Sequence, residues 1–123
     1  MKSRKIALIS LMLLGTLVFS GCAFKEYRAQ KIHLQQPQWD EVTVQKVAAR
    51  KVEIGMTDAM VVAALGKPHA ISQEGDYSKW VYATLETYGQ GGVYYKHVYS
   101  VYLKDGQVVK TEGDRSRLGL PPW

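Results

Sequence analysis

The strongest constraint in this sequence is an apolar run, residues 6–19, that ends just before the only cysteine of the chain. Met1–Lys5, ahead of the run, carries three basic residues and no acidic one. As a helix the run would rise roughly 21 Å, which is short of the ~30 Å hydrocarbon layer of a bilayer. A basic start, a short apolar stretch and small residues before a cleavage point are typical of a secretory signal peptide. We therefore expect residues 1–21 to be removed and the remainder to fold.

The cleavage point, Phe19-Ser20-Gly21-Cys22, resembles a bacterial lipobox, with Phe19 where leucine is usual. In that motif the cysteine receives diacylglycerol, the peptidase cuts before it, and its new amino group is acylated. An ordinary signal peptide with an incidental cysteine is the alternative. Cys22 nevertheless stands at the one position that the motif requires, and a lone cysteine cannot form an internal disulfide. We predict a lipidated Cys22, because two or more acyl chains hold a protein stably in a membrane.

The lipobox resemblance also implies a compartment. Lipoproteins with aspartate after the cysteine are retained in the inner membrane, and Ala23 takes that place here. The expected location is therefore the outer membrane of a Gram-negative type envelope, with the folded part facing the periplasm. The covalent lipid is the only non-protein group that we expect, with no metal and no other cofactor.

Charge gives little support to a nucleic-acid partner. The chain has a net charge of +5, but three of its sixteen basic residues lie in Met1–Lys5, so the charge falls to +2 once they leave. A nucleic-acid-binding domain would show a strongly basic patch. The remaining residues suffice for one small domain with a modest core.

Residues 22–39 are polar and rich in glutamine, and they lack a clear helical or strand period. We expect them to form a flexible lipidated tether, with no more than a short helical turn, that lifts the domain off the membrane. Trp39, at the end of this segment, is expected to pack onto the domain. The domain itself is predicted to span residues 40–113.

Two short helices are predicted at the start of the domain. The first, residues 40–51, has Asp40 as a plausible N-cap and an apolar face that includes Val44 and Val47. The second helix begins after Thr57 and carries Val61 and Leu65 four positions apart.

Glycine and proline delimit the second helix. Gly55 supplies a bend before it, Gly66 a left-handed C-cap after it, and Pro68 forbids its continuation. A helix this short cannot persist alone, because nucleation is too costly, so it must pack on another element.

Three strands follow, at residues 78–85, 93–103 and 107–111, with Trp80 in the first of them. Asp105-Gly106 joins the last two, and this dipeptide favours the positive φ angles of a type I′ hairpin turn. The element order predicts an α+β fold in which two short helices pack on one face of a three-stranded antiparallel β-meander. Residues 114–123 are expected to be a flexible C-terminal tail: either a frayed end, or a docking peptide anchored by Leu118, Leu120 and Trp123.

Catalytic chemistry is not expected. The three histidines, His33, His69 and His97, lie in separate elements without metal-ligand spacing. No phosphate-binding loop opens a helix, and no nucleophile with a base can be nominated.

The surface best suited to binding is the predicted sheet. Tyrosine buries area at low entropic cost and keeps a polar tip, so it is enriched in protein interfaces. Cross-strand aromatic pairs that merely stabilise a small exposed sheet are the simpler alternative. The candidate partner-binding residues are Tyr94, Tyr95, Tyr99 and Tyr102.

These features together resemble the SmpA/OmlA (BamE-like) domain family of outer-membrane lipoproteins. The residues that carry the resemblance are the lipobox at Cys22, Gly55-Met56-Thr57, Leu65-Gly66-Lys67-Pro68, Trp80-Val81-Tyr82, and residues 101–109 around Asp105-Gly106. The resemblance implies a non-enzymatic scaffold that binds an envelope protein, with components of the β-barrel assembly machinery as the leading candidates. The alternative is a stand-alone periplasmic inhibitor, or an osmotic or envelope-stress lipoprotein, that binds an envelope enzyme or cell-wall material.

Overall fold

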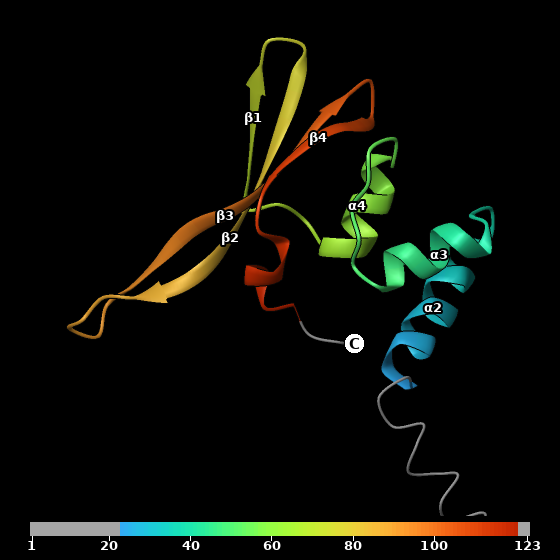
Figure 1. Cartoon of the computed structure of the whole chain (residues 1–123), viewed down its shortest axis with the longest axis horizontal. Helices are drawn as coiled ribbons and strands as arrows, with labels where there is room; N and C mark the ends of the chain where they lie inside the picture. The colour runs from blue at the N-terminus through green and yellow to red at the C-terminus, as the bar shows by residue number, and fades with distance from the viewer. Residues whose placement is uncertain (1–22, 121–123) are drawn as a thin grey trace, which may run out of the picture.

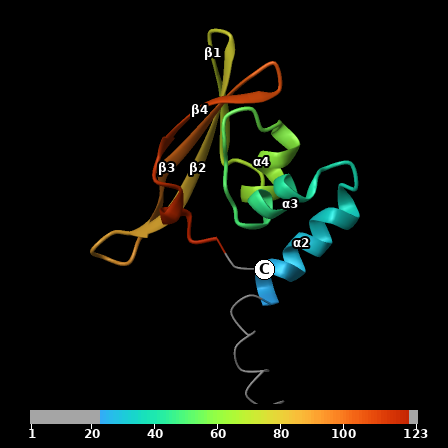
Figure 2. The same cartoon turned by 45° about the vertical axis from the view of Figure 1, so that its right-hand side comes forward.

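The computed structural model describes residues 23–120, so the predicted signal peptide and Cys22 lie outside it. Three α-helices precede a four-stranded antiparallel sheet, whose strands lie side by side in the order β1-β2-β3-β4. The elements are α2 (Ala23–Gln35), α3 (Glu41–Ala48), α4 (Asp58–Leu65), β1 (Ala70–Glu74), β2 (Tyr77–Thr87), β3 (Val93–Lys104), β4 (Gln107–Gly113) and a 3-10 turn, η1 (Arg115–Leu118). The helices lie to one side of the sheet (Figures 1 and 2). The predicted α+β class is confirmed.

The strand count was wrong, because β1 was not predicted. All five residues of β1 are exposed, and only Ile71 is strongly apolar, so the strand shows no inward-facing pattern. Glu74 pairs with Tyr77 across a two-residue turn in which Gly75 has φ +63°. Glycine at the first central position is typical of a type II′ hairpin turn, and Gly75-Asp76 was the signal that could have revealed this strand.

The first described segment also differs from expectation. Residues 23–35, expected to belong to a flexible tether, form helix α2. Ala29 and Ile32 lie one turn apart on the buried side of α2 and join the core cluster that includes α3, while Arg28 is buried beside them. Two buried apolar residues in a long polar segment are too few to produce a visible period, and this is why the helix was missed. Trp39 packs against the core, as predicted.

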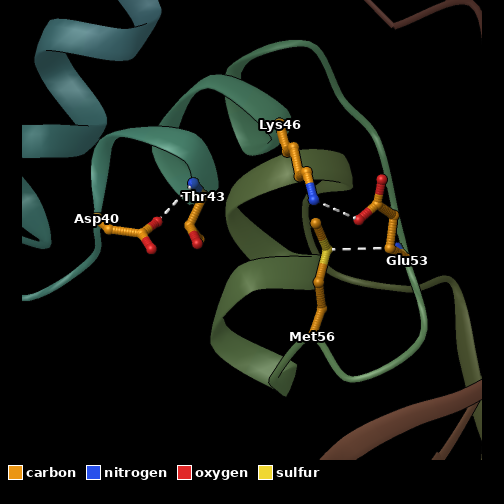
Figure 3. Close-up of polar contacts among 5 residues, drawn as sticks. All are labelled: Asp40, Thr43, Lys46, Glu53 and Met56. Carbon is orange, nitrogen blue, oxygen red and sulfur yellow. Dashed lines mark hydrogen bonds and ion pairs between the residues drawn. The ribbon is translucent and has the colours of Figure 1, made fainter.

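Helix α3 begins as predicted, at the Asp40 cap. The Asp40 Oδ1 atom accepts a hydrogen bond of 2.7 Å from the Thr43 amide (Figure 3). Farther along, the Lys46 ammonium forms an ion pair of 2.8 Å with Glu53, and the Glu53 amide donates to the Met56 sulfur at 3.4 Å. These contacts fix the loop that leads from α3 to α4.

Helix α4 has the predicted cap residues, although the conformation of the C-cap differs from the prediction. The Thr57 hydroxyl oxygen accepts from the Met60 amide at 3.4 Å, and Gly66 ends the helix with φ +84°. The ψ of Gly66 is −173°, so the cap needs glycine but is extended rather than left-handed helical. The Gly66 carbonyl then accepts a hydrogen bond of 2.9 Å from the Tyr82 hydroxyl, which ties the end of α4 to β2. Pro68, half-buried, follows as predicted.

The residues just before α4 are hydrogen-bonded to β4, the strand at the opposite edge of the sheet from β1. The Gly55 amide donates to the Val108 carbonyl, and the Val108 amide donates to the Met56 carbonyl, each at 2.8 Å. Gly55 has φ +93°, which accounts for the predicted bend. Asp105 and Gly106 have φ values of +52° and +76°, so the predicted β3–β4 turn is confirmed.

The core lies between the helices and one face of the sheet. Its largest fully buried side chains are Val47 from α3, Val61 from α4, Val101 from β3 and Val108 from β4. Trp80 is partly buried and packs against this cluster.

The described part of the C-terminal segment is ordered against the domain. Asp114 caps η1 by accepting from the Ser116 amide at 3.0 Å, and Leu118 and Leu120 pack against the core. Residues 114–120 are therefore neither frayed nor extended away from the domain as a peptide. Within residues 23–120 no helix is long and apolar enough to cross a membrane.

Candidate interaction surface

The face of the sheet that points away from the helices, here called the outer face, is centred on Tyr102. Strand register places Lys79 of β2 and Lys110 of β4 directly opposite Tyr102 of β3. Their ammonium nitrogens lie 5.5 Å and 5.1 Å from the centre of the Tyr102 ring. Two cations thus flank one aromatic ring, an arrangement stabilised by the ring quadrupole.

Two carboxylates complete the row. Glu74 lies 3.7 Å from the Lys79 ammonium, and Glu112 lies 2.7 Å from that of Lys110. The Tyr102 hydroxyl donates to Glu112 at 3.0 Å. The row therefore has two cations at its centre, beside Tyr102, and a carboxylate at each end, with residues from all four strands.

The ionisation of these groups follows from the contacts. Hydrogen bonding to Tyr102, and then the nearby Glu74, raise the pKa of Lys79. The hydrogen bond to Glu112 raises the pKa of Lys110, and the bonds from Lys110 and Tyr102 lower the pKa of Glu112. All three groups are charged at neutral pH, so the outer face presents fixed positive and negative positions.

A hollow of about 470 Å³ lies beside this row, between the β1–β2 and β3–β4 turns. Tyr77 and Lys104 line it, with the Lys104 ammonium 5.7 Å from the centre of the Tyr77 ring. Val109 and Lys110 line it as well. The outer face therefore combines an aromatic floor, exposed lysines and a concave shape, which suits protein recognition.

The four candidate tyrosines do not share a surface. Tyr99 is 6 % exposed and belongs to the core, with its ring 6.5 Å from that of Tyr82. Tyr102 is on the opposite face and is 9 % exposed, because the two lysines cover its ring. Only Tyr95, 62 % exposed, presents a largely open ring, which lies 5.4 Å from that of His69.

Tyr94 is held on the inner side of the β2–β3 hairpin. Its hydroxyl donates to Glu86 at 2.9 Å, which raises the pKa of Tyr94, and its ring lies 4.7 Å from that of Tyr88. The same Glu86 carboxylate receives a hydrogen bond of 2.7 Å from Arg117 of η1. Tyr94 thus helps to connect the hairpin to the C-terminal segment.

Val98 and Tyr99 are neighbours in β3, yet both are buried. This break in the alternation explains why the tyrosines do not lie on the faces that strict alternation predicts. The register between β2 and β3 shifts at Tyr82 and Ala83, so Val98 is an extra residue in β3. A bulge of this kind reverses the facing pattern along a strand. Strict alternation from Tyr94 to Tyr102 could not foresee it.

Several residues of the outer face were not among the candidates, namely Tyr77, Lys79, Lys104 and Lys110. Lys79 and Tyr77 alternate along β2 with inward-facing neighbours, so the signal was present in the period of the strand. Tyr77 lies just before the predicted strand 78–85, and the candidate residues all came from the predicted strand 93–103. Among the residues that the structure describes, no three His, Cys, Asp or Glu side chains gather as metal ligands would.

The comparisons with known proteins give one result. Residues 42–113 match the family profile described as the outer membrane protein assembly factor BamE domain. This range runs from the first turn of α3 to the end of β4 and includes three helix caps or turns described above, at Thr57, Gly66 and Asp105. No curated protein and no solved structure matches the chain significantly.

Proposed function

Since the chain belongs to the BamE domain family, we propose that it is a non-enzymatic outer-membrane lipoprotein that binds and stabilises an envelope protein complex. The observation that carries the proposal is the extent of the family match, which covers α3, α4 and all four strands. The matched region therefore contains every residue of the outer face. The leading partners are components of the machinery that assembles outer-membrane β-barrels.

The lipid anchor is the second part of the proposal. Cys22 directly precedes α2, whose first residue is Ala23. Acyl chains on Cys22 would place the domain within a short distance of the membrane surface. Because α2 packs on α3, the anchor would be coupled to the domain by a packed helix rather than by a freely moving linker.

The outer face is the proposed contact with the complex. Lys79 and Lys110 are held by ion pairs with Glu74 and Glu112, and fixed charges favour selection of a partner with a complementary pattern. The hollow beside Tyr77 would accept a projecting side chain of the partner. A matched pair of charges on the partner would give specificity more than affinity.

Affinity purification tests this proposal. The full-length tagged chain is purified from detergent-solubilised outer membranes, and co-purifying proteins are identified by mass spectrometry. Recovery of barrel-assembly components supports the proposal, and their absence contradicts it. Recovery instead of one periplasmic enzyme, or of cell-wall material, would point to an inhibitor or stress lipoprotein.

Charge reversal then tests the surface. In Lys79→Glu/Lys110→Glu both cations beside Tyr102 are replaced, and we expect recovery of the complex to fall about tenfold, as for loss of a close charge pair. Lys51→Glu is the matched control, because Lys51 is exposed beyond the end of α3, away from the sheet. Equal recovery by the two variants would remove the outer face from the proposal while leaving the family assignment in place.

A further inference from the structure

The β2–β3 hairpin extends beyond the rest of the sheet. The pairing of β1 with β2 stops at Ala70 and Val81, and that of β4 with β3 stops at Gly113 and Tyr99. Residues 83–87 and 93–97 therefore form a two-stranded arm, which projects from the sheet in both views (Figures 1 and 2). An isolated two-stranded hairpin is only marginally stable in water, so this length of arm calls for an explanation.

The backbone of β2 has an open edge along the arm. The Val81 carbonyl accepts from the His69 amide at 2.9 Å, and the Ala83 amide donates to the His69 Nδ1 atom at 3.1 Å. Odd-numbered residues of β2 thus direct their backbone amides and carbonyls toward the β1 side. The next two odd-numbered residues after Ala83 are Leu85 and Thr87. Within residues 23–120 no strand pairs with them on that side.

The hydrogen bonds that β2 makes on its other side, toward β3, also show which backbone groups of β2 face the open edge. The Tyr88 amide donates across the hairpin to the Gly92 carbonyl at 2.8 Å, so even-numbered residues face β3. Leu85 and Thr87 consequently leave two amides and two carbonyls in a row at the open edge. Such a row is a template for pairing with another strand.

The open edge of β2 lacks the charges that usually prevent pairing. Its only charged residue within the arm is Glu86, which lies on the inner side and is engaged by Arg117 at 2.7 Å and by Lys96 at 3.7 Å. Lys96 of β3 lies on the same inner side as its partner Glu86. Proteins protect exposed edges with charged residues, lysine above all, and residues 83–87 of β2 contain no lysine and no charge besides the paired Glu86.

The outer side of the arm is apolar and exposed. Leu85 and Tyr95 are directly opposite each other and are 59 % and 62 % exposed, and Val93, paired with Thr87, is 64 % exposed. In a strand added beside β2, every second side chain would lie on the same surface as Leu85. The neutral edge and the apolar neighbours select an uncharged segment with apolar residues at alternate positions.

The arm is already fixed in position. On its inner side the Arg117–Glu86 ion pair and the Tyr94–Glu86 hydrogen bond hold it against η1. A pre-positioned edge loses less conformational freedom on binding than a mobile one.

We propose that the β2 edge of the arm binds an extended, uncharged segment of a partner protein, which pairs antiparallel to β2 opposite Leu85 and Thr87 and continues the line of β1. Five residues of partner would span the edge, at a length of roughly 17 Å. The inference deepens the proposed function and rests on it only for the location of the partner in the envelope.

Site-specific photo-crosslinking in cells tests this pairing. A photoreactive amino acid replaces Leu85 or Thr87, one at a time, in the full-length lipidated protein, and the crosslinked partner residues are mapped by mass spectrometry. We expect the two positions to reach residues two apart in one partner segment and in reverse order, because paired strands run antiparallel. Crosslinks to helical residues, to several unrelated proteins or to a second copy of this chain would overturn the proposal, and so would the absence of crosslinks.

Proline variants test the backbone bonds. With the photoreactive residue at position 85, Thr87→Pro removes an amide from the open edge, and we expect the crosslink yield to fall about tenfold. Val93→Pro is the control, because Val93 pairs with Thr87 and its amide faces the β3 edge. Equal yields in the two variants, with unchanged thermal unfolding, would contradict strand pairing at β2.

The two proposals fail separately. A mapped strand-like contact with a protein outside the barrel-assembly machinery would retain the edge pairing and remove the proposed partner. Recovery of assembly components without crosslinks at Leu85 or Thr87 would retain the proposed function and remove the edge pairing.

Discussion

Gly113 at the end of β4 lies directly against the backbone of Val98, the extra residue of the β3 bulge. A Cβ atom at position 113 would collide with the Val98 carbonyl oxygen, and Gly113 has φ +91°. The next amide along, that of Asp114, donates to the same carbonyl at 2.9 Å. The bulge, the end of β4 and the start of η1 thus meet at one point, where only glycine fits.

Replacement of Gly113 by alanine should therefore be strongly destabilising. We expect Gly113→Ala to lower the free energy of unfolding by about 3 kcal/mol, since it combines a backbone clash with a disfavoured φ. Gly75→Ala is the control, because Gly75 also has positive φ but has open space around it, so a loss of about 1 kcal/mol is expected. Urea unfolding of both variants measures the difference, and similar losses would show that the contact with Val98 is unimportant.

Local signals in the sequence predicted the caps and turns correctly. Asp40, Thr57 and Asp105-Gly106 each act through neighbours within three residues, so spacing alone is sufficient. Gly66 was placed correctly as the end of α4, although local spacing indicated neither its ψ angle nor the hydrogen bond that its carbonyl accepts from Tyr82.

Features that depend on tertiary contacts were not predicted. Strand β1 is exposed along its whole length and exists because β2 offers it an edge. Helix α2 is defined by the packing of Ala29 and Ile32 on the rest of the core. The separation of Tyr99 from the displayed surface follows from a bulge between strands, which no single-strand pattern contains.

Stability should depend on pH through Glu112. The bonds from Lys110 and Tyr102 lower the pKa of Glu112 in the folded protein below the usual value of 4.5. A carboxylate with a lowered folded pKa stabilises the protein above its unfolded pKa, and this stabilisation is lost as pH falls through the folded value. We expect the urea concentration at the midpoint of unfolding to decrease when the pH is lowered below 4.5. The decrease should be smaller in Glu112→Gln, because glutamine cannot titrate.

Asp40 and Asp114 also have lowered pKa values, because each accepts hydrogen bonds at the start of a helical turn. The Glu112→Gln variant should therefore retain part of the acid sensitivity. A pH profile identical to that of the unmodified protein would show that the Glu112 contacts make no net contribution.

Lipidation at Cys22 is tested independently of the fold. Cys22→Ser removes the only thiol, so we expect no incorporation of labelled palmitate and accumulation of an uncleaved precursor. Cell fractionation should show loss of the protein from the outer membrane. Phe19→Leu, which restores the usual lipobox residue, is the positive control and should process at least as well as the natural sequence. Labelled palmitate on the Cys22→Ser protein would contradict the predicted attachment site.

The Arg117–Glu86 contact predicts how the arm is held to the domain. Arg117 is part of η1, Glu86 is part of β2, and their 2.7 Å contact is the shortest ion pair that η1 makes among the described residues. In Arg117→Ala we expect amide hydrogen exchange to accelerate about tenfold in residues 83–97, because local opening of the arm loses one charge-assisted hydrogen bond. Exchange in α3 and α4 should be unchanged, since Leu118 and Leu120 still cover the core.

Lys96→Ala is the matched control. The Lys96 ammonium lies 3.7 Å from the same Glu86 carboxylate, but Lys96 belongs to the arm and not to η1. Exposed pairs at such distances contribute little, so a change of less than about twofold is expected. The comparison separates attachment of the arm to η1 from charge balance within the arm. Faster exchange in Lys96→Ala than in Arg117→Ala would mean that the arm is stabilised by its own cross-strand pairs, and that η1 plays no part in presenting the β2 edge.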